Sequence, residues 1–134
     1  GPIGPTGATG PSSSLLTGRA SLGSTMGYLS PVGASTVTAT AAQVSTLSPN
    51  VALTARNFSI KLSAAPGEGN QRQIILVSGG QAVLGCVFSA AHTTCMNNGP
   101  SSSVIAPGSE LAIYSYVEGT PAPAEVKWGF TLGS

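Results

Sequence analysis

Charge is scarce in this sequence. Only 7% of its 134 residues are Asp, Glu, Lys or Arg, and aspartate is missing altogether, whereas ordinary globular proteins carry about 25% charged residues. The net charge is +1, so no strong field attracts nucleic acid or an anionic membrane surface. No apolar run approaches the length of about 20 residues that a membrane-spanning helix needs. We therefore expect no nucleic-acid partner and no insertion into a membrane.

The side chains that carry enzyme chemistry are also few. His92 is the one histidine, and the carboxylates are Glu68, Glu110, Glu118 and Glu125. A serine nucleophile needs a histidine that an acid holds in place, and the G-x-S-x-G elbow of hydrolases is absent. We interpret His92 as an exposed turn residue and expect the protein not to be an enzyme.

Metal ligands do not form a recognisable set either. Cys86, His92 and Cys95 are spaced C-x5-H-x2-C, which lacks the fourth ligand of a structural zinc site, and a calcium site would need more carboxylates. We expect no metal and no other cofactor. Two cysteines this close in a chain of low charge are typical of a disulfide in an oxidising compartment; the alternative is a pair of buried free thiols.

What the sequence does have is a regular beginning. Glycine occupies positions 1, 4, 7 and 10, and Pro2, Pro5, Ala8 and Pro11 follow these glycines. In a collagen triple helix three chains share an axis at which only glycine fits. Residues 1–11 therefore predict a collagen-like segment and a protein that works as three copies; the alternative is a flexible leader or a tag remnant. Three triplets are too few to hold a triple helix, so we expect a C-terminal fragment of a longer chain.

A junction is expected over residues 12–30, between this segment and a head domain at residues 31–134. Leu15 and Leu16 are adjacent there, and we predict that they pack around the threefold axis as a trimer neck. The alternative is an ordinary linker whose two leucines pack onto the next domain.

From residue 31 onward the pattern is that of β-strands. Turn residues recur about every 8–12 positions, as in sandwiches and barrels, and apolar residues alternate with polar ones. No stretch has a long helical period. The expected strands are one or two in 32–44, then 51–62, 72–77, 82–89, 110–117 and 125–132, with a loop at 63–71. We expect an all-β, antiparallel, jelly-roll-like sandwich.

Three stretches, in this order, carry a resemblance. They are NFSIKLSAAPGEGN at 57–70, GCVFSAAHTTC at 85–95 and IAPGSELAIYSYVEGTPAPAEVKWGF at 105–130. Together with the Gly-X-Y leader they resemble the C-terminal heads of bacterial and phage collagen-like proteins, which are similar to trimeric C1q/TNF-like sandwiches. The resemblance covers residues 50–132 approximately. It implies a homotrimeric head at the end of an extracellular fibre, on a bacterial cell surface or a virion.

The resemblance also implies a ligand, because heads of this kind are associated with binding sulfated polysaccharides. Arginine and lysine bind sulfate and carboxylate groups through charge-assisted hydrogen bonds. Arg56 and Lys61 are an odd number of residues apart and point to opposite faces unless a bulge intervenes. The alternative is a set of scattered solubilising charges. The candidate ligand-binding residues are Arg19, Arg56, Lys61, Arg72 and Lys127.

Three tyrosines could stack on sugars, but we favour another role. Tyr114 and Tyr116 alternate with the apolar Leu111, Ile113 and Val117. If the apolar set faces the core, the tyrosines, with Tyr28, are best placed in a contact between subunits.

The expected function is therefore that of a trimeric adhesin head that holds three chains in register and binds extracellular anionic polysaccharide, such as a sulfated glycosaminoglycan. The alternative is a purely structural trimerisation cap of a phage tail fibre or a spore-surface filament.

Overall fold

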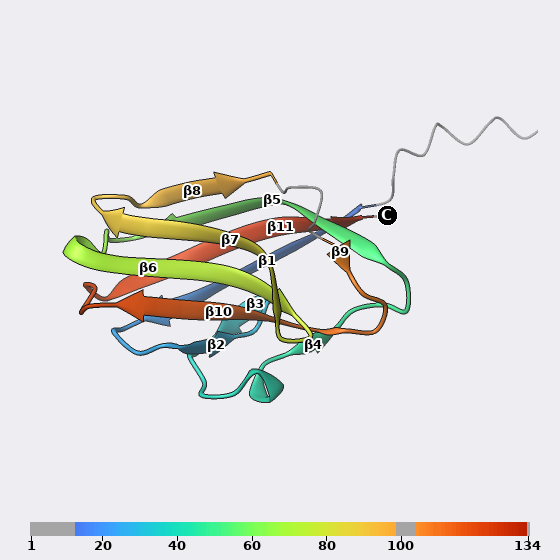
Figure 1. Ribbon diagram of the computed structural model, residues 1–134. Helices are drawn as coiled ribbons and strands as arrows, with labels where there is room; N and C mark the ends of the chain where they lie inside the picture. Colours follow the sequence, from blue (N-terminus) through green and yellow to red (C-terminus); the bar gives the residue numbers. More distant parts are fainter. Residues whose placement is uncertain (1–12, 99–103, 134) are drawn as a thin grey trace, which may run out of the picture.

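Two β-sheets packed face to face make up the computed structural model (Figure 1), which describes residues 13–98 and 104–133. The collagen-like residues 1–11 lie outside the described part. Sheet A contains β3 (Gly33–Ser35), β1 (Ser13–Leu22), β11 (Ala124–Gly133), β5 (Leu53–Leu62) and β8 (Thr94–Asn97) in this spatial order, with β9 (Val104–Ile105) also paired to β5. Sheet B contains β2 (Gly27–Leu29), β10 (Glu110–Glu118), β6 (Gly67–Ser78) and β7 (Gln81–Ala90), with β4 (Thr46–Leu47) also paired to β10.

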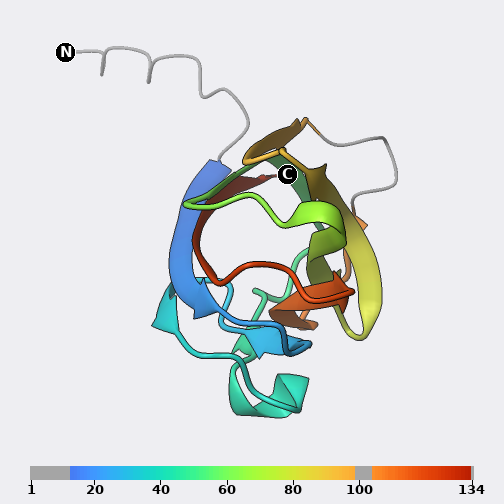
Figure 2. The same cartoon turned by 90° about the vertical axis from the view of Figure 1, so that its left-hand side faces the viewer.

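The strand pairing is nested, as in a jelly roll. β1 pairs with β11, β2 with β10, β5 with β8, and β6 with β7, and all four pairs are antiparallel. The chain therefore crosses repeatedly between the sheets, which enclose the interior seen end-on in Figure 2. The expected all-β sandwich with a jelly-roll-like order is confirmed. A single turn of 3-10 helix, η1 (Ala41–Gln43), is the only helical element among the described residues, and no helix of that part is long and apolar enough to cross a membrane.

The core forms where the alternation of the sequence predicts it. Phe58 of β5 and Phe130 of β11 are fully buried and meet edge to face, with ring centroids 5.9 Å apart. Leu111, Ile113 and Val117 of β10 are buried on the opposite sheet. Strand β6, whose residues 74–77 are all apolar, lies between β10 and β7.

The interpretation of residues 12–30 as a junction is wrong for the part that is described. Residues 13–22 form β1, which pairs with β11 along its whole length, and residues 27–29 form β2. The inward positions of β1 hold Ala20 and Leu22, which are buried, and Leu16, which packs against the core. The other inward positions of β1 hold small residues, so the alternation of apolar and polar residues is weak in this part of the sequence. The strand can be recognised only from its pairing with β11.

One of the two remaining expectations is met and the other needs correction. Of the one or two strands expected in 32–44, one is present, the three-residue β3, followed by a single bridge between Thr38 and Tyr28 and by η1. The expected loop at 63–71 ends early, because β6 already begins at Gly67. Gly67 and Gly69 have positive φ angles of 97° and 80°, and the pairing of β6 with β7 shifts between Gly67 and Gln71. The start of β6 is therefore irregular, and its glycine-rich sequence resembles that of a loop.

The predicted disulfide is present and joins the two sheets. Cys86 lies on β7, an edge strand of sheet B, and Cys95 lies on β8, an edge strand of sheet A. Their Cα atoms are 6.0 Å apart. Beside the disulfide, the side-chain amide of Asn97 donates a hydrogen bond of 2.9 Å to the carbonyl of Gly85. The disulfide therefore closes the open side of the sandwich, where no strand bridges the sheets.

Removing the disulfide should destabilise the protein. The Cys86→Ala/Cys95→Ala variant is expected to lose about 2–3 kcal/mol of unfolding free energy, because the closed loop is short and its constraint on the unfolded chain is modest. Urea unfolding monitored by tryptophan fluorescence measures this loss. The reduced parent protein is the control and should match the variant; an unchanged urea midpoint would contradict the prediction.

Candidate anion-binding face

Three basic residues stand in line across the outer face of sheet A. In the strand register Arg19 of β1 lies opposite Lys127 of β11, and Lys127 lies opposite Lys61 of β5. Residues directly opposite one another on antiparallel strands have Cβ atoms about 4.5–5.5 Å apart. All three side chains are exposed. We call Arg19, Lys127 and Lys61 the cation row.

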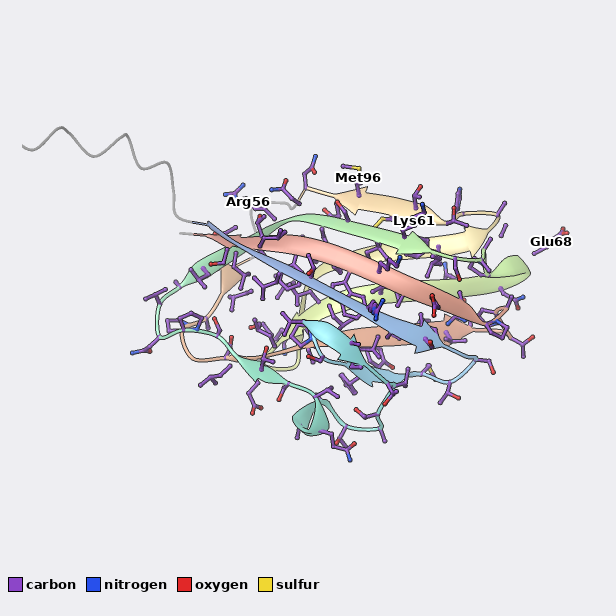
Figure 3. All side chains as sticks on the ribbon, turned by 180° about the vertical axis from the view of Figure 1, so that it is seen from behind. Arg56, Lys61, Glu68 and Met96 are labelled. Carbon is purple, nitrogen blue, oxygen red and sulfur yellow. A yellow bond between two sulfur atoms is a disulfide. The ribbon has the colours of Figure 1, made fainter. Side chains whose placement is uncertain are left out.

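A β-bulge brings a fourth cation to the same face. The register of β11 with β5 shifts between the pairs Gly129–Ser59 and Thr131–Arg56. Between these two pairs β11 has one residue and β5 has two. Asn57 takes up the extra residue with a φ of 57°, a conformation that asparagine tolerates better than most residues. Arg56 and Lys61 therefore share one face despite their odd separation, and both lie on β5 in the view of sheet A (Figure 3).

Side-chain hydrogen bonds hold the bulge. The amide nitrogen Nδ2 of Asn57 donates to Oγ1 of Thr131 at 3.2 Å. The same hydroxyl donates to the carbonyl oxygen of Arg56 at 3.3 Å. The position of Arg56 on the sheet is thus set by two contacts to β11. The sequence signal for the bulge was a single Asn within an otherwise alternating strand.

Between the cation row and Arg56 the face is lined by small side chains. Thr17, Gly129 and Ser59 form the next row across β1, β11 and β5. Shallow grooves run on both sides of Lys127. One of about 390 Å³ is lined on the β1 side by residues that include Arg19 and Ala34. The other, of about 310 Å³, lies towards β8 and is lined by residues that include Lys61 and Met96.

The cations on this face lack acidic partners. No carboxylate oxygen lies within 4.0 Å of a basic nitrogen in residues 13–98 and 104–133. The single carboxylate on the outer face of β11 is Glu125, which is opposite Ser21, in the row beyond the cation row. Like charges placed opposite one another repel and destabilise a sheet. An arrangement of this kind is relieved when an external anion binds.

Arg72 does not belong to this face, and its expected role as a ligand-binding residue is wrong. Its side chain is fully buried, 0% exposed, because it occupies an inward position of β6. Its Nη2 donates hydrogen bonds to the carbonyl oxygens of Gly23 at 2.8 Å and Ala122 at 2.9 Å. Burial lowers the pKa of the guanidinium. Arg72 thus ties together two loops at the end of the sandwich opposite Ser13.

The tyrosines lie on the outer face of sheet B. Tyr28 and Tyr114 are cross-strand neighbours whose ring centroids are 4.9 Å apart. The hydroxyl of Tyr116 donates to a carboxylate oxygen of Glu118 at 3.0 Å, and this hydrogen bond and the negative charge raise the pKa of Tyr116. All three rings are half-buried. Their place in a subunit contact stays a prediction.

His92 lies at the surface, as expected for a turn residue. His92 is exposed in the turn between β7 and β8, and its Nδ1 lies 3.4 Å from the hydroxyl of Ser89. Within the described ranges, no group of three or more His, Cys, Asp or Glu side chains is arranged to hold a metal ion.

No family model, curated protein or solved structure matches this chain. The cation row and the Gly-X-Y repeat are therefore the features from which a function can be inferred.

Arg72 and Arg56 should differ in their effect on stability. Arg72→Ala removes two part-buried hydrogen bonds from a charged donor and empties a buried position, which should cost about 2 kcal/mol. Arg56→Ala changes an exposed side chain and should stay within about 0.5 kcal/mol of the parent. Urea unfolding of the two variants tests this contrast, and equal stability would contradict the buried role of Arg72.

Proposed function

We propose that the protein is the trimeric head of a collagen-like surface fibre and that it binds extracellular anionic polysaccharide through the outer face of sheet A. The observation that carries the proposal is the cation row, three exposed basic residues in cross-strand register without an acidic partner. The disulfide is typical of an extracellular protein. A bacterial surface or a virion fibre is the setting that fits the Gly-X-Y leader.

The arrangement of the cations fits a polymer better than a single small anion. Neighbouring strands are about 4.8 Å apart, so the cation row extends about 10 Å across three strands. Arg56 adds a charge further along β5. Shallow grooves flank Lys127, and a pocket of about 250 Å³ between Arg19 and Lys127 is also lined by Glu125. A polysaccharide with repeated sulfate or carboxylate groups can meet several of these cations at once.

Hydroxyl groups between the cations can contribute to recognition of sugars. Thr17, Ser59 and Thr94 are exposed on the same face, and a hydroxyl can both donate to and accept from a sugar hydroxyl. Gly129 carries no side chain, so a ligand can approach the backbone of β11 closely. The face thus combines charge with small polar groups.

A trimer would make a weak site effective. A polysaccharide long enough to contact three heads binds the second and third sites intramolecularly, which raises avidity by roughly 10²–10⁴. A trimer without this ligand would be a structural cap of a phage tail fibre or a spore-surface filament, and the experiment below separates these two roles.

Retention on an immobilised sulfated polysaccharide such as heparin tests the proposal. The parent protein should be retained at low salt and released by moderate salt, because screening weakens exposed charge contacts. Lys127→Ala should weaken the affinity of each head about tenfold, or about 1.4 kcal/mol, and Lys61→Ala/Lys127→Ala should abolish retention. Isothermal titration with a short sulfated oligosaccharide measures the effect on one head.

Two variants serve as controls. Lys127→Arg preserves the charge and should keep most of the affinity, and Gln73→Ala changes the outer face of sheet B and should have no effect. Failure of the parent to bind at low salt would overturn the polysaccharide role and favour the structural cap.

A further inference from the structure

Exposed apolar side chains gather at one end of the sandwich. The described chain has seven exposed large hydrophobic residues, and four of them are at the end where β1 begins. We call these four residues the stalk-end patch: Leu15 (73% exposed), Leu47 (73%), Val51 (51%) and Val104 (55%). Apolar clusters of this kind on an otherwise polar surface mark sites of interaction.

The strand register places the stalk-end patch around the start of the head. Ser13 lies opposite Gly133, Gly133 opposite Thr54, and Thr54 opposite Val104, in one row across sheet A. Leu15 is two residues along β1 from Ser13. Strands β4 and β9 and the end of β11 meet at this end of the molecule (Figure 1).

Leu47 reaches the same end from sheet B. It lies opposite Glu110, where β10 begins, and the backbone of neighbouring Ser48 donates to the carbonyl of Ser109 at 2.8 Å. Val51 follows shortly, just before β5. The patch therefore draws its residues from both sheets.

A groove leads from the patch towards the core. It has a volume of about 380 Å³ and is lined mainly by leucines, among them Leu15, Leu47 and Leu53. Ser48, 2% exposed, also lines it, and its hydroxyl has no hydrogen-bond partner in the part of the chain that the structure describes. An apolar side chain of another segment could fill this groove, and a polar backbone group next to that side chain could form a hydrogen bond with the hydroxyl of Ser48.

We propose that the stalk-end patch is the contact between copies of this chain, with Leu15 of one copy seated against the groove of the next. This inference rests on the proposed trimer. In a triple helix the three chains share an axis, and an extended chain spans about 3.3–3.6 Å per residue. Only Ser12 lies between Pro11, the last residue of the repeat, and Ser13, so three chains that share such an axis up to Pro11 cannot have their copies of Ser13 far apart.

This geometry identifies the occupant. The end of the head at which Ser13 lies must face the two sister heads, and Leu15 and Val104 lie at that end, Leu15 two residues along β1 and Val104 in the same row as Ser13. Leu16 points inward and packs against the core, so it takes part in this contact only as a lining residue of the groove. Of the two leucines, Leu15 is the one that is exposed and extends towards a neighbouring copy.

Cross-linking of single cysteine variants tests the contact. Both native cysteines are in the disulfide, so Leu15→Cys introduces one reactive thiol per chain. A short bifunctional maleimide should link most Leu15→Cys chains in pairs, as seen on a denaturing gel. Met96→Cys is the matched control, since Met96 is 76% exposed on the outer face of sheet A but lies three strands away on β8; it should give at least tenfold less product.

A charge placed in the patch should weaken assembly. Leu15→Asp and Leu47→Asp are expected to raise the concentration at which trimers dissociate at least tenfold, as measured by sedimentation equilibrium. Thr17→Asp adds the same charge two residues further along the exposed face of β1 and should leave the mass unchanged. Urea unfolding confirms that each variant is folded.

The outcomes separate this inference from the proposed function. A parent mass of three chains with strong Leu15→Cys cross-linking supports the contact. A mass of three chains without that cross-linking, and with Leu15→Asp still trimeric, overturns the stalk-end contact but leaves the trimeric head. A parent mass of one chain overturns both the contact and the trimer, whereas polysaccharide binding is tested independently on a single head.

Discussion

The pairing of β1 with β11 is the constraint on which the other features of the structure depend. These strands come from the two ends of the described chain and run side by side over ten register positions. The pairing places Arg19 beside Lys127 and Ser13 beside Gly133. This register thus places Arg19 in the cation row and Leu15 in the stalk-end patch, and a slip of one residue would turn every side chain of β1 to the other face.

The outer faces of the two sheets differ in chemistry. The outer face of sheet A carries four exposed cations with small polar residues between them. The bulge at Asn57 places Arg56 on the same face as the other three cations. Sheet B presents half-buried tyrosines and aliphatic side chains such as Ile75 and Val77. Of the nine charged residues in the chain, Arg72 is buried and Glu125 shares the outer face of sheet A with the four cations. The charges exposed elsewhere are therefore all negative, and they belong to Glu68, Glu110 and Glu118.

Different interactions close the ends and the open side of the sandwich. The Cys86–Cys95 disulfide joins the edge strands β7 and β8, and the buried guanidinium of Arg72 ties the loops beyond β1 and β10 together. The end around Ser13 has neither device and exposes leucines and valines instead. This difference is physically reasonable if sister chains cover that end, because exposed apolar surface gains most from burial against a partner.

The sequence by itself determined the class of fold, most of the strands and the disulfide. Alternation with a period of two is a local property, so residues such as Phe58, Ile60 and Trp128 reveal their inward orientation without knowledge of their partners. The tertiary structure alone decided that residues 13–22 are a strand, that Arg72 is buried and that Arg56 shares a face with Lys61. Each of these depends on the register between strands distant in sequence, and no local pattern encodes which residue of β1 or β5 will lie opposite a given residue of β11.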